Sequence, residues 1–126
     1  MNRREAEFTA YVLADIERLK GRYNPTAFRG MVQRHGAVAT AKRLLADPGT
    51  TSYGFGKLWE LGALGNSIEY AVCLPWFQPL FTPEEVEKAE RRLVAHDFPI
   101  GERMERAAQS PPDWAVDSAL TDEDER

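Results

Sequence analysis

Apolar residues recur at helical spacing near the start of the chain. Phe8, Val12, Ile16, Leu19 and Tyr23 follow one another at steps of four, four, three and four. Such spacing places side chains on one face of a helix, where they pack against a core. The pattern predicts an amphipathic helix from residue 3 to about residue 21.

Further helical segments follow, each bounded by residues that start or stop helices. The clearest start is Thr82-Pro83-Glu84-Glu85, in which a threonine N-cap precedes a proline at the first helical position and a glutamate at the third. Gly36 suits the left-handed residue that ends a helix, and Pro75 ends a nearly all-apolar one. The predicted segments are about 25–35, 37–46, 55–61, 66–74 and 82–97.

Residues 51–81 hold the least regular part of the pattern. Asn66 and Glu69 have the spacing of a capping box, so we expect Asn66 to start a helix and Glu69 to bond back to it. The segment 75–81 is too rich in proline for a helix interior and too apolar for an exposed loop. We therefore expect it to lie folded across the core.

Beyond residue 98 the apolar pattern fades, and residues 102–109 have the composition for only one or two helical turns. Trp114 is an aromatic residue in polar surroundings, and it is expected to dock either on this domain or on a partner. The predicted fold is all-α. It is a bundle of five or six short helices over residues 3–98, followed by an acidic, partly ordered tail over residues 99–126.

The formal net charge of −4 is unevenly distributed over the 126 residues. Residues 1–50 carry nine Lys/Arg against five Asp/Glu, whereas residues 51–126 carry seven against fifteen. An acidic total argues against a general coat for nucleic acid but leaves room for one basic face. That face would use the cations of the first three helices, namely Arg18, Arg22, Arg29, Arg34, Lys42 and Arg43.

The sequence also bears on membrane insertion, disulfide formation and metal binding. No apolar run approaches the roughly 20 residues of a membrane span, and the first residues lead into a charged helix, so we expect a cytoplasmic protein. Cys73 is the single cysteine and has no internal disulfide partner. No cysteine and histidine set has metal-ligand spacing, so neither a metal nor a cofactor is expected.

Several short motifs occur in a definite order over about residues 8–98. They are Tyr23-x-Pro25-x-x-Phe28, Ala41-Lys42-Arg43-Leu44-Leu45, Gly54-Phe55-x-x-Leu58-Trp59-Glu60-Leu61-Gly62, Ser67-Ile68-Glu69 and Leu80-Phe81-Thr82. This order resembles a widespread bacterial helical domain of unknown function, which occurs alone or appended to larger bacterial proteins, some of them nuclease-like or defence-associated. Where relatives tend to carry an arginine and an aspartate, this chain has Ala63 and Gly65. The resemblance implies a small helical fold and a bacterial setting.

Two carboxylates, Glu60 and Glu69, lie in the aromatic stretch 51–81, where burial would suit acid/base chemistry. The stronger interpretation is structural, since Glu69 has a capping position and Glu60 lies near Lys57. No serine has a histidine or lysine at a spacing that suggests a catalytic triad. No catalytic residue is therefore assigned.

These observations favour a non-catalytic accessory or protein-interaction module in a bacterial assembly, which contacts another protein or a second copy of itself. Tyr53, Trp76 and Trp114 are the candidate contact residues, because exposed aromatic side chains often carry interface energy. The alternative is a nucleic-acid-binding accessory domain that uses the basic face.

Overall fold

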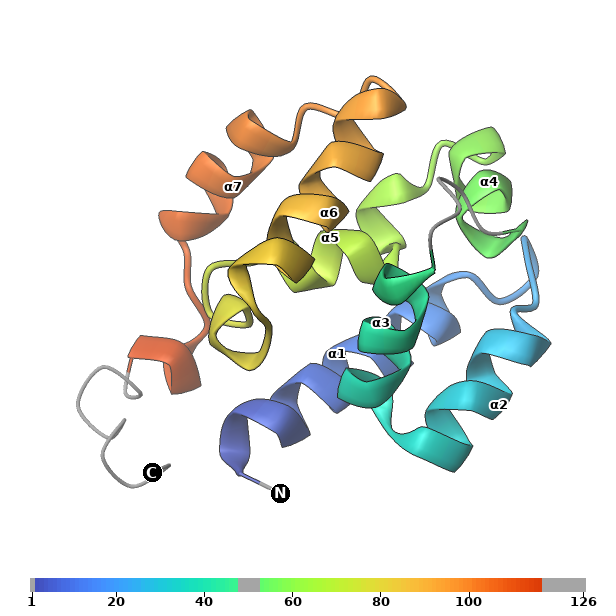
Figure 1. The fold of residues 1–126 in the computed structure, drawn as a ribbon, viewed down its shortest axis with the longest axis horizontal. Coiled ribbons are helices and arrows are strands. Elements are labelled where there is room, and N and C mark those ends of the chain that lie inside the picture. The colour runs from blue at the N-terminus through green and yellow to red at the C-terminus, as the bar shows by residue number, and fades with distance from the viewer. Residues whose placement is uncertain (1, 48–52, 117–126) are drawn as a thin grey trace.

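The structure is a computed structural model that describes residues 2–47 and 53–116. Within these ranges the fold is all-α, as predicted, and no residue forms a β-strand. Two short 3-10 turns, η1 (Leu64–Asn66) and η2 (Gln78–Leu80), lie between longer helices. The α-helices, drawn in Figure 1, are α1 (Arg3–Arg18), α2 (Thr26–His35), α3 (Ala37–Ala46), α4 (Tyr53–Glu60), α5 (Ile68–Cys73), α6 (Pro83–Ala95) and α7 (Ile100–Ala108).

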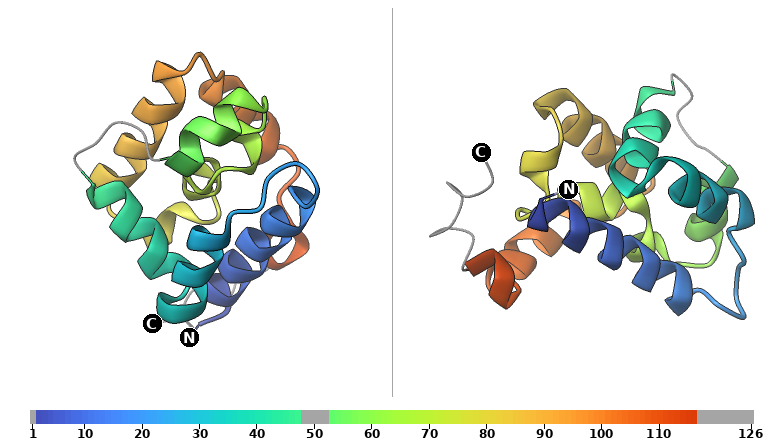
Figure 2. Two further views of the ribbon diagram at one scale, coloured as in Figure 1. Left: turned by 90° about the vertical axis from the view of Figure 1, so that its right-hand side faces the viewer. Right: turned by 90° about the horizontal axis from the view of Figure 1, so that it is seen from below.

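Helix α1 runs across the lower face of the molecule, as Figure 2 shows in its right-hand view. Asn2 caps its start by accepting a hydrogen bond from the Glu5 amide. The predicted apolar stripe is buried, with Phe8, Val12 and Ile16 at its centre. The amphipathic helix is therefore confirmed, although it ends at Arg18, somewhat earlier than expected.

Helices α2 and α3 pack against each other and are joined by Gly36. The φ angle of Gly36 is 86°, a left-handed conformation that glycine adopts at little cost. Helix α3 also packs on α1, α5 and α6, so it lies near the centre of the bundle.

Helix α5 is buried throughout and is capped by Ser67. The Ser67 hydroxyl accepts a hydrogen bond from the Tyr70 amide at 3.1 Å and donates one to the Leu64 carbonyl at 2.7 Å. The capping box predicted for Asn66 and Glu69 is therefore wrong. The cap lies one residue later, which leaves the side chains of Asn66 and Glu69 available for contacts with other helices.

The proline-rich segment after α5 lies across the core, as predicted. Phe77 and Phe81 are buried and meet the ring of Phe8 edge-on, with ring centroids 5.1 and 5.3 Å apart. A guanidinium nitrogen of the buried Arg4 donates to the Trp76 carbonyl oxygen at 2.7 Å. This bond ties the start of α1 to the segment.

Helix α6 starts with the predicted capping box. The Thr82 amide donates to Glu85 Oε1 at 2.9 Å, and the Glu85 amide donates to Thr82 Oγ1 at 3.1 Å. Lys42 Nζ donates to the same Glu85 oxygen at 2.8 Å. The start of α6 is thereby linked to α3.

The segment after residue 98 contains packed residues. Helix α7 packs on α6, and the Arg103 guanidinium lies over the rings of Tyr70 and Phe98, 5.3 and 5.0 Å from their centroids. Residues 113–116 form a further helical turn, and the Trp114 ring lies 5.6 Å from that of Phe77. Of the two docking places expected for Trp114, the structure shows the one on this domain.

Candidate functional site

A cavity of about 240 Å³ opens between α1, α2, α4 and the start of α5. Its wall is mainly apolar, with aromatic rings from Tyr23, Phe28 and Phe55. Three polar side chains, Asp15, Asn66 and Glu69, share this wall, and we call the cavity the carboxylate pocket. Its remaining lining residues are Val12, Ile16, Leu19, Pro25, Ala27, Met31, Leu44, Gly54, Leu58 and Ile68.

Asp15 reaches the carboxylate pocket because it lies on the apolar stripe of α1. It follows Val12 by three residues and precedes Leu19 by four, which places the three side chains on one helical face. Only 6% of its side chain is exposed. An ionisable side chain on the buried face of a helix is expensive to desolvate unless it has partners.

The partners of Asp15 are concentrated on one of its two carboxylate oxygens. Oδ1 accepts a hydrogen bond from Arg18 Nη1 at 2.8 Å and another from Asn66 Nδ2 at 3.1 Å. Oδ2 accepts none from the described residues. Burial raises the pKa of the Asp15 carboxyl above its ordinary value, and the bonds from Asn66 and Arg18 offset this only in part.

Glu69 is held differently, by an arginine that is itself buried. Arg92 Nη1 donates to Glu69 Oε2 at 3.2 Å, and only 6% of the Arg92 side chain and 4% of the Glu69 side chain are exposed. Arg92 Nη2 also donates to the Asp47 carbonyl at the end of α3, at 3.1 Å. Burial raises the pKa of Glu69, and Arg92 acts in the opposite direction.

The predicted pair of Glu60 and Glu69 is not brought together in the carboxylate pocket. Glu60 is exposed at the end of α4, where Lys57 Nζ lies 3.6 Å from its carboxylate, and it does not line the cavity. Glu69 does line it. The carboxylate that accompanies Glu69 is instead Asp15, from a helix that is distant in sequence.

The carboxylate pocket has the composition of a binding site. Among the described residues, its lining includes no serine, cysteine, histidine or lysine, the side chains that most often act as nucleophiles or bases together with a carboxylate. Among the described residues, no group of three or more His, Cys, Asp or Glu side chains is placed to hold a metal ion. Mostly apolar walls with a few polar groups are typical of small-molecule sites.

Most residues of the predicted basic face have partners within the fold. Arg18 pairs with Asp15, Arg22 donates to the Leu61 carbonyl, Arg29 donates to Asn24 Oδ1, and Lys42 pairs with Glu85. Arg34 and Arg43 are exposed and form no ion pair with the described residues. Nucleic-acid binding stays a prediction.

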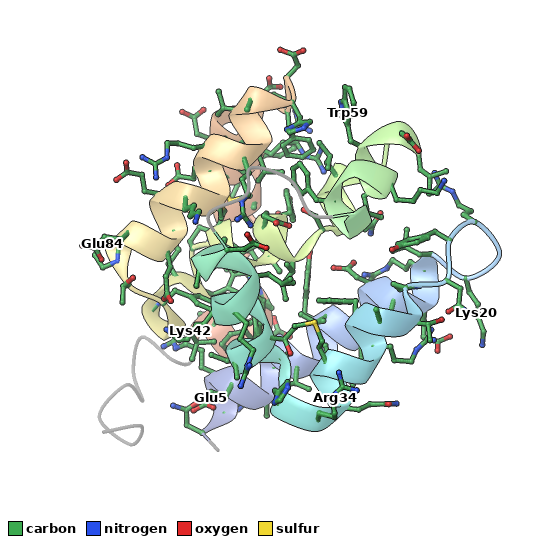
Figure 3. The ribbon with its side chains drawn as sticks, turned by 45° about the vertical axis from the view of Figure 1, so that its right-hand side comes forward. Glu5, Lys20, Arg34, Lys42, Trp59 and Glu84 are labelled. Carbon is green, nitrogen blue, oxygen red and sulfur yellow. The ribbon has the colours of Figure 1, made fainter. Side chains whose placement is uncertain are left out.

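The predicted aromatic contact residues are mostly engaged within the fold. Trp76 and Trp114 are partly buried and pack against the core. Tyr53 begins α4, and its side chain lies outside what the structure describes. Trp59, which the sequence analysis did not select, is 54% exposed and projects from α4 in Figure 3.

The histidine and cysteine side chains have structural environments. His96 Nδ1 lies 2.9 Å from the Arg92 carbonyl oxygen, a contact typical of histidines near helix ends, and its ring meets Phe55 and Trp59 edge-on. His35 is exposed. Cys73 is buried, and burial raises the pKa of its thiol to about 12, which makes it a poor nucleophile.

Comparisons with known proteins give no assignment. No protein-family model, curated protein or solved structure matches this chain. Within the described residues, no helix combines the length and the apolar character needed to cross a lipid bilayer.

Sequence reasoning missed Asp15, Asn66 and Arg92 at this site. A usable signal existed for two of them, because Asp15 interrupts the apolar stripe of α1 and Arg92 follows the inward-facing Ala89 by three residues. Charged residues on an apolar face indicate buried polar contacts. Asn66 offered no such signal, since its position also suited a helix cap.

Proposed function

We propose that this chain is a non-catalytic binding module that takes a small, largely apolar molecule into the carboxylate pocket. The observation that carries the proposal is a cavity of about 240 Å³ with apolar and aromatic walls and a few polar groups. Empty apolar space of this size forfeits packing contacts, and a ligand that fills it recovers them.

The partners of the two carboxylates favour binding over catalysis. Each already has an arginine within 3.2 Å, and the described part of the lining includes no serine, cysteine, histidine or lysine. The sequence-based prediction of a protein-interaction module in a bacterial assembly is compatible with this role, because a ligand-holding domain can serve a larger protein.

The test uses 2-phenylethanol as a neutral apolar probe, titrated into the full chain by calorimetry and by two-dimensional NMR. Ala27 lies at the exposed rim of the carboxylate pocket, so Ala27→Trp should obstruct it. Ala10 is an exposed alanine on α1 that does not line the pocket, so Ala10→Trp is the matched control.

We expect saturable binding to the wild type and to Ala10→Trp, with shifted resonances at Phe28, Phe55 and their neighbours. The Ala27→Trp variant should bind 2-phenylethanol at least tenfold more weakly, because the indole ring would occupy part of the carboxylate pocket. Saturable binding that is equal in both variants would place the probe elsewhere and contradict the proposal, as would no binding at all.

A further inference from the structure

Among the described residues that line the carboxylate pocket, the charged side chains all have one sign. They are Asp15 and Glu69, and both are acids. Their arginine partners, Arg18 and Arg92, are not among the lining residues. A ligand in the cavity therefore meets carboxylate oxygens and aromatic rings.

The two acids differ in what they offer to a ligand. Glu69 is in a buried ion pair with Arg92, so the positive charge of Arg92 already balances its negative charge inside the protein. The Asp15 partner Arg18 is 59% exposed, and water screens its attraction. Asp15 Oδ2, which accepts no bond from the described residues, belongs to a side chain that lines the cavity.

We infer that the ligand of the carboxylate pocket is a small apolar amine, whose ammonium group donates a hydrogen bond to Asp15 Oδ2 while its apolar body packs on Phe28 and Phe55. This inference rests on the proposed binding function and specifies its ligand class. The cavity volume of about 240 Å³ suits an amine with one aromatic ring or a short branched chain.

Three physical effects favour a cation at this position. A hydrogen bond between an ammonium and a carboxylate is roughly twice as strong as one between neutral groups. The Tyr23, Phe28 and Phe55 rings line the same wall, and ring faces attract cations. Burial also raises the pKa of Asp15, and a bound cation would relieve the cost of its ionised form.

The decisive comparison uses three probes of nearly equal size: 2-phenylethylamine, 2-phenylethanol and phenylacetate, each titrated into the full chain at pH 7. We expect the amine to bind about tenfold more tightly than the alcohol. Both can donate to Asp15 Oδ2, but only the ammonium group adds the attraction between opposite charges. The acid should bind most weakly, because its charge is repelled by Asp15 and Glu69.

Asp15→Asn identifies the group responsible. Asparagine keeps an oxygen that accepts from Arg18 and Asn66 but removes the negative charge, so the preference for the amine over the alcohol should disappear. The matched control is Glu60→Gln, which removes an exposed carboxylate outside the pocket and should keep the full preference. Far-ultraviolet circular dichroism checks that both variants are folded.

Failure of this inference is distinguishable from failure of the proposed function. If the alcohol binds as tightly as the amine, the pocket binds apolar molecules and the inference on the ammonium group is wrong. Tightest binding of phenylacetate would overturn it as well. If none of the three probes binds, the proposed function fails together with the inference.

Discussion

Asp15 and Glu69 line the same pocket and are almost equally buried, yet their partners differ. The partner of Glu69, Arg92, is buried beside it and also holds the end of α3 through the Asp47 carbonyl. The partner of Asp15, Arg18, lies on the surface, and both bonds to Asp15 fall on one oxygen. The first arrangement links α5 to α6 and to the end of α3, whereas the second leaves one oxygen of Asp15 without a bond from the described residues. Two almost equally buried carboxylates can therefore differ in how fully their oxygens are bonded.

The largest effect should come from breaking the buried pair. Arg92→Met would leave Glu69 as an uncompensated buried carboxylate and remove the bond to the Asp47 carbonyl. We expect a loss of about 3–5 kcal/mol in the free energy of unfolding, measured by urea denaturation at pH 7. The double variant Arg92→Met/Glu69→Gln should recover a substantial part of this loss. A loss below about 1 kcal/mol in the single variant would show that the pair does not stabilise the bundle.

A smaller effect with a distinct pH dependence is expected for Asp15→Asn. Because the pKa of Asp15 is raised in the folded protein, its protonated form contributes stability below its ordinary value of 3.8, and that contribution is lost as the pH rises through the folded-state pKa. Asparagine does not ionise, so the variant does not lose this stability as the pH rises. Relative to the wild type, Asp15→Asn should therefore be more stable at pH 7 than at pH 3.

Unfolding free energies of both proteins at the two pH values test this expectation, since the other titrating groups are common to both and cancel. Glu85, whose pKa is lowered by its bonds to Lys42 and Thr82, is one such shared group, and its contribution is lost as the pH falls. If the stability of Asp15→Asn relative to the wild type falls between pH 3 and pH 7, the pKa of Asp15 is not raised in the folded protein.

The smallest effect should come from Arg18→Gln. Its exposed guanidinium is screened by water, so we expect a loss of at most about 1 kcal/mol in the free energy of unfolding, and less at high salt. Lys57→Gln, which removes the exposed partner of Glu60, provides a matched surface control with a similar or smaller loss. If Arg18→Gln lowers the free energy of unfolding as much as Arg92→Met does, the two ion pairs contribute equally to stability. The proposed difference between Asp15 and Glu69 would then be wrong.

Much of the fold follows from signals that act over a few residues. The apolar stripe of α1, the left-handed Gly36 and the Thr82 capping box are local features, and each lies where the sequence indicated. The start of α5 was predicted one residue too early. Asn66 and Ser67 are both good capping residues. In the structure Ser67 caps α5, whereas Asn66 donates to Asp15 of α1, a partner that no neighbouring residue indicates.

The amino-acid sequence by itself determined an all-α chain, the approximate bounds of its helices and which face of each helix turns inward, because spacing and capping are properties of neighbouring residues. Only the tertiary structure decided the carboxylate pocket. Asp15 meets Asn66 across 51 positions, and Glu69 meets Arg92 across 23. Such contacts depend on how whole helices pack. A local sequence pattern does not specify which two buried polar side chains, on different helices, will contact each other.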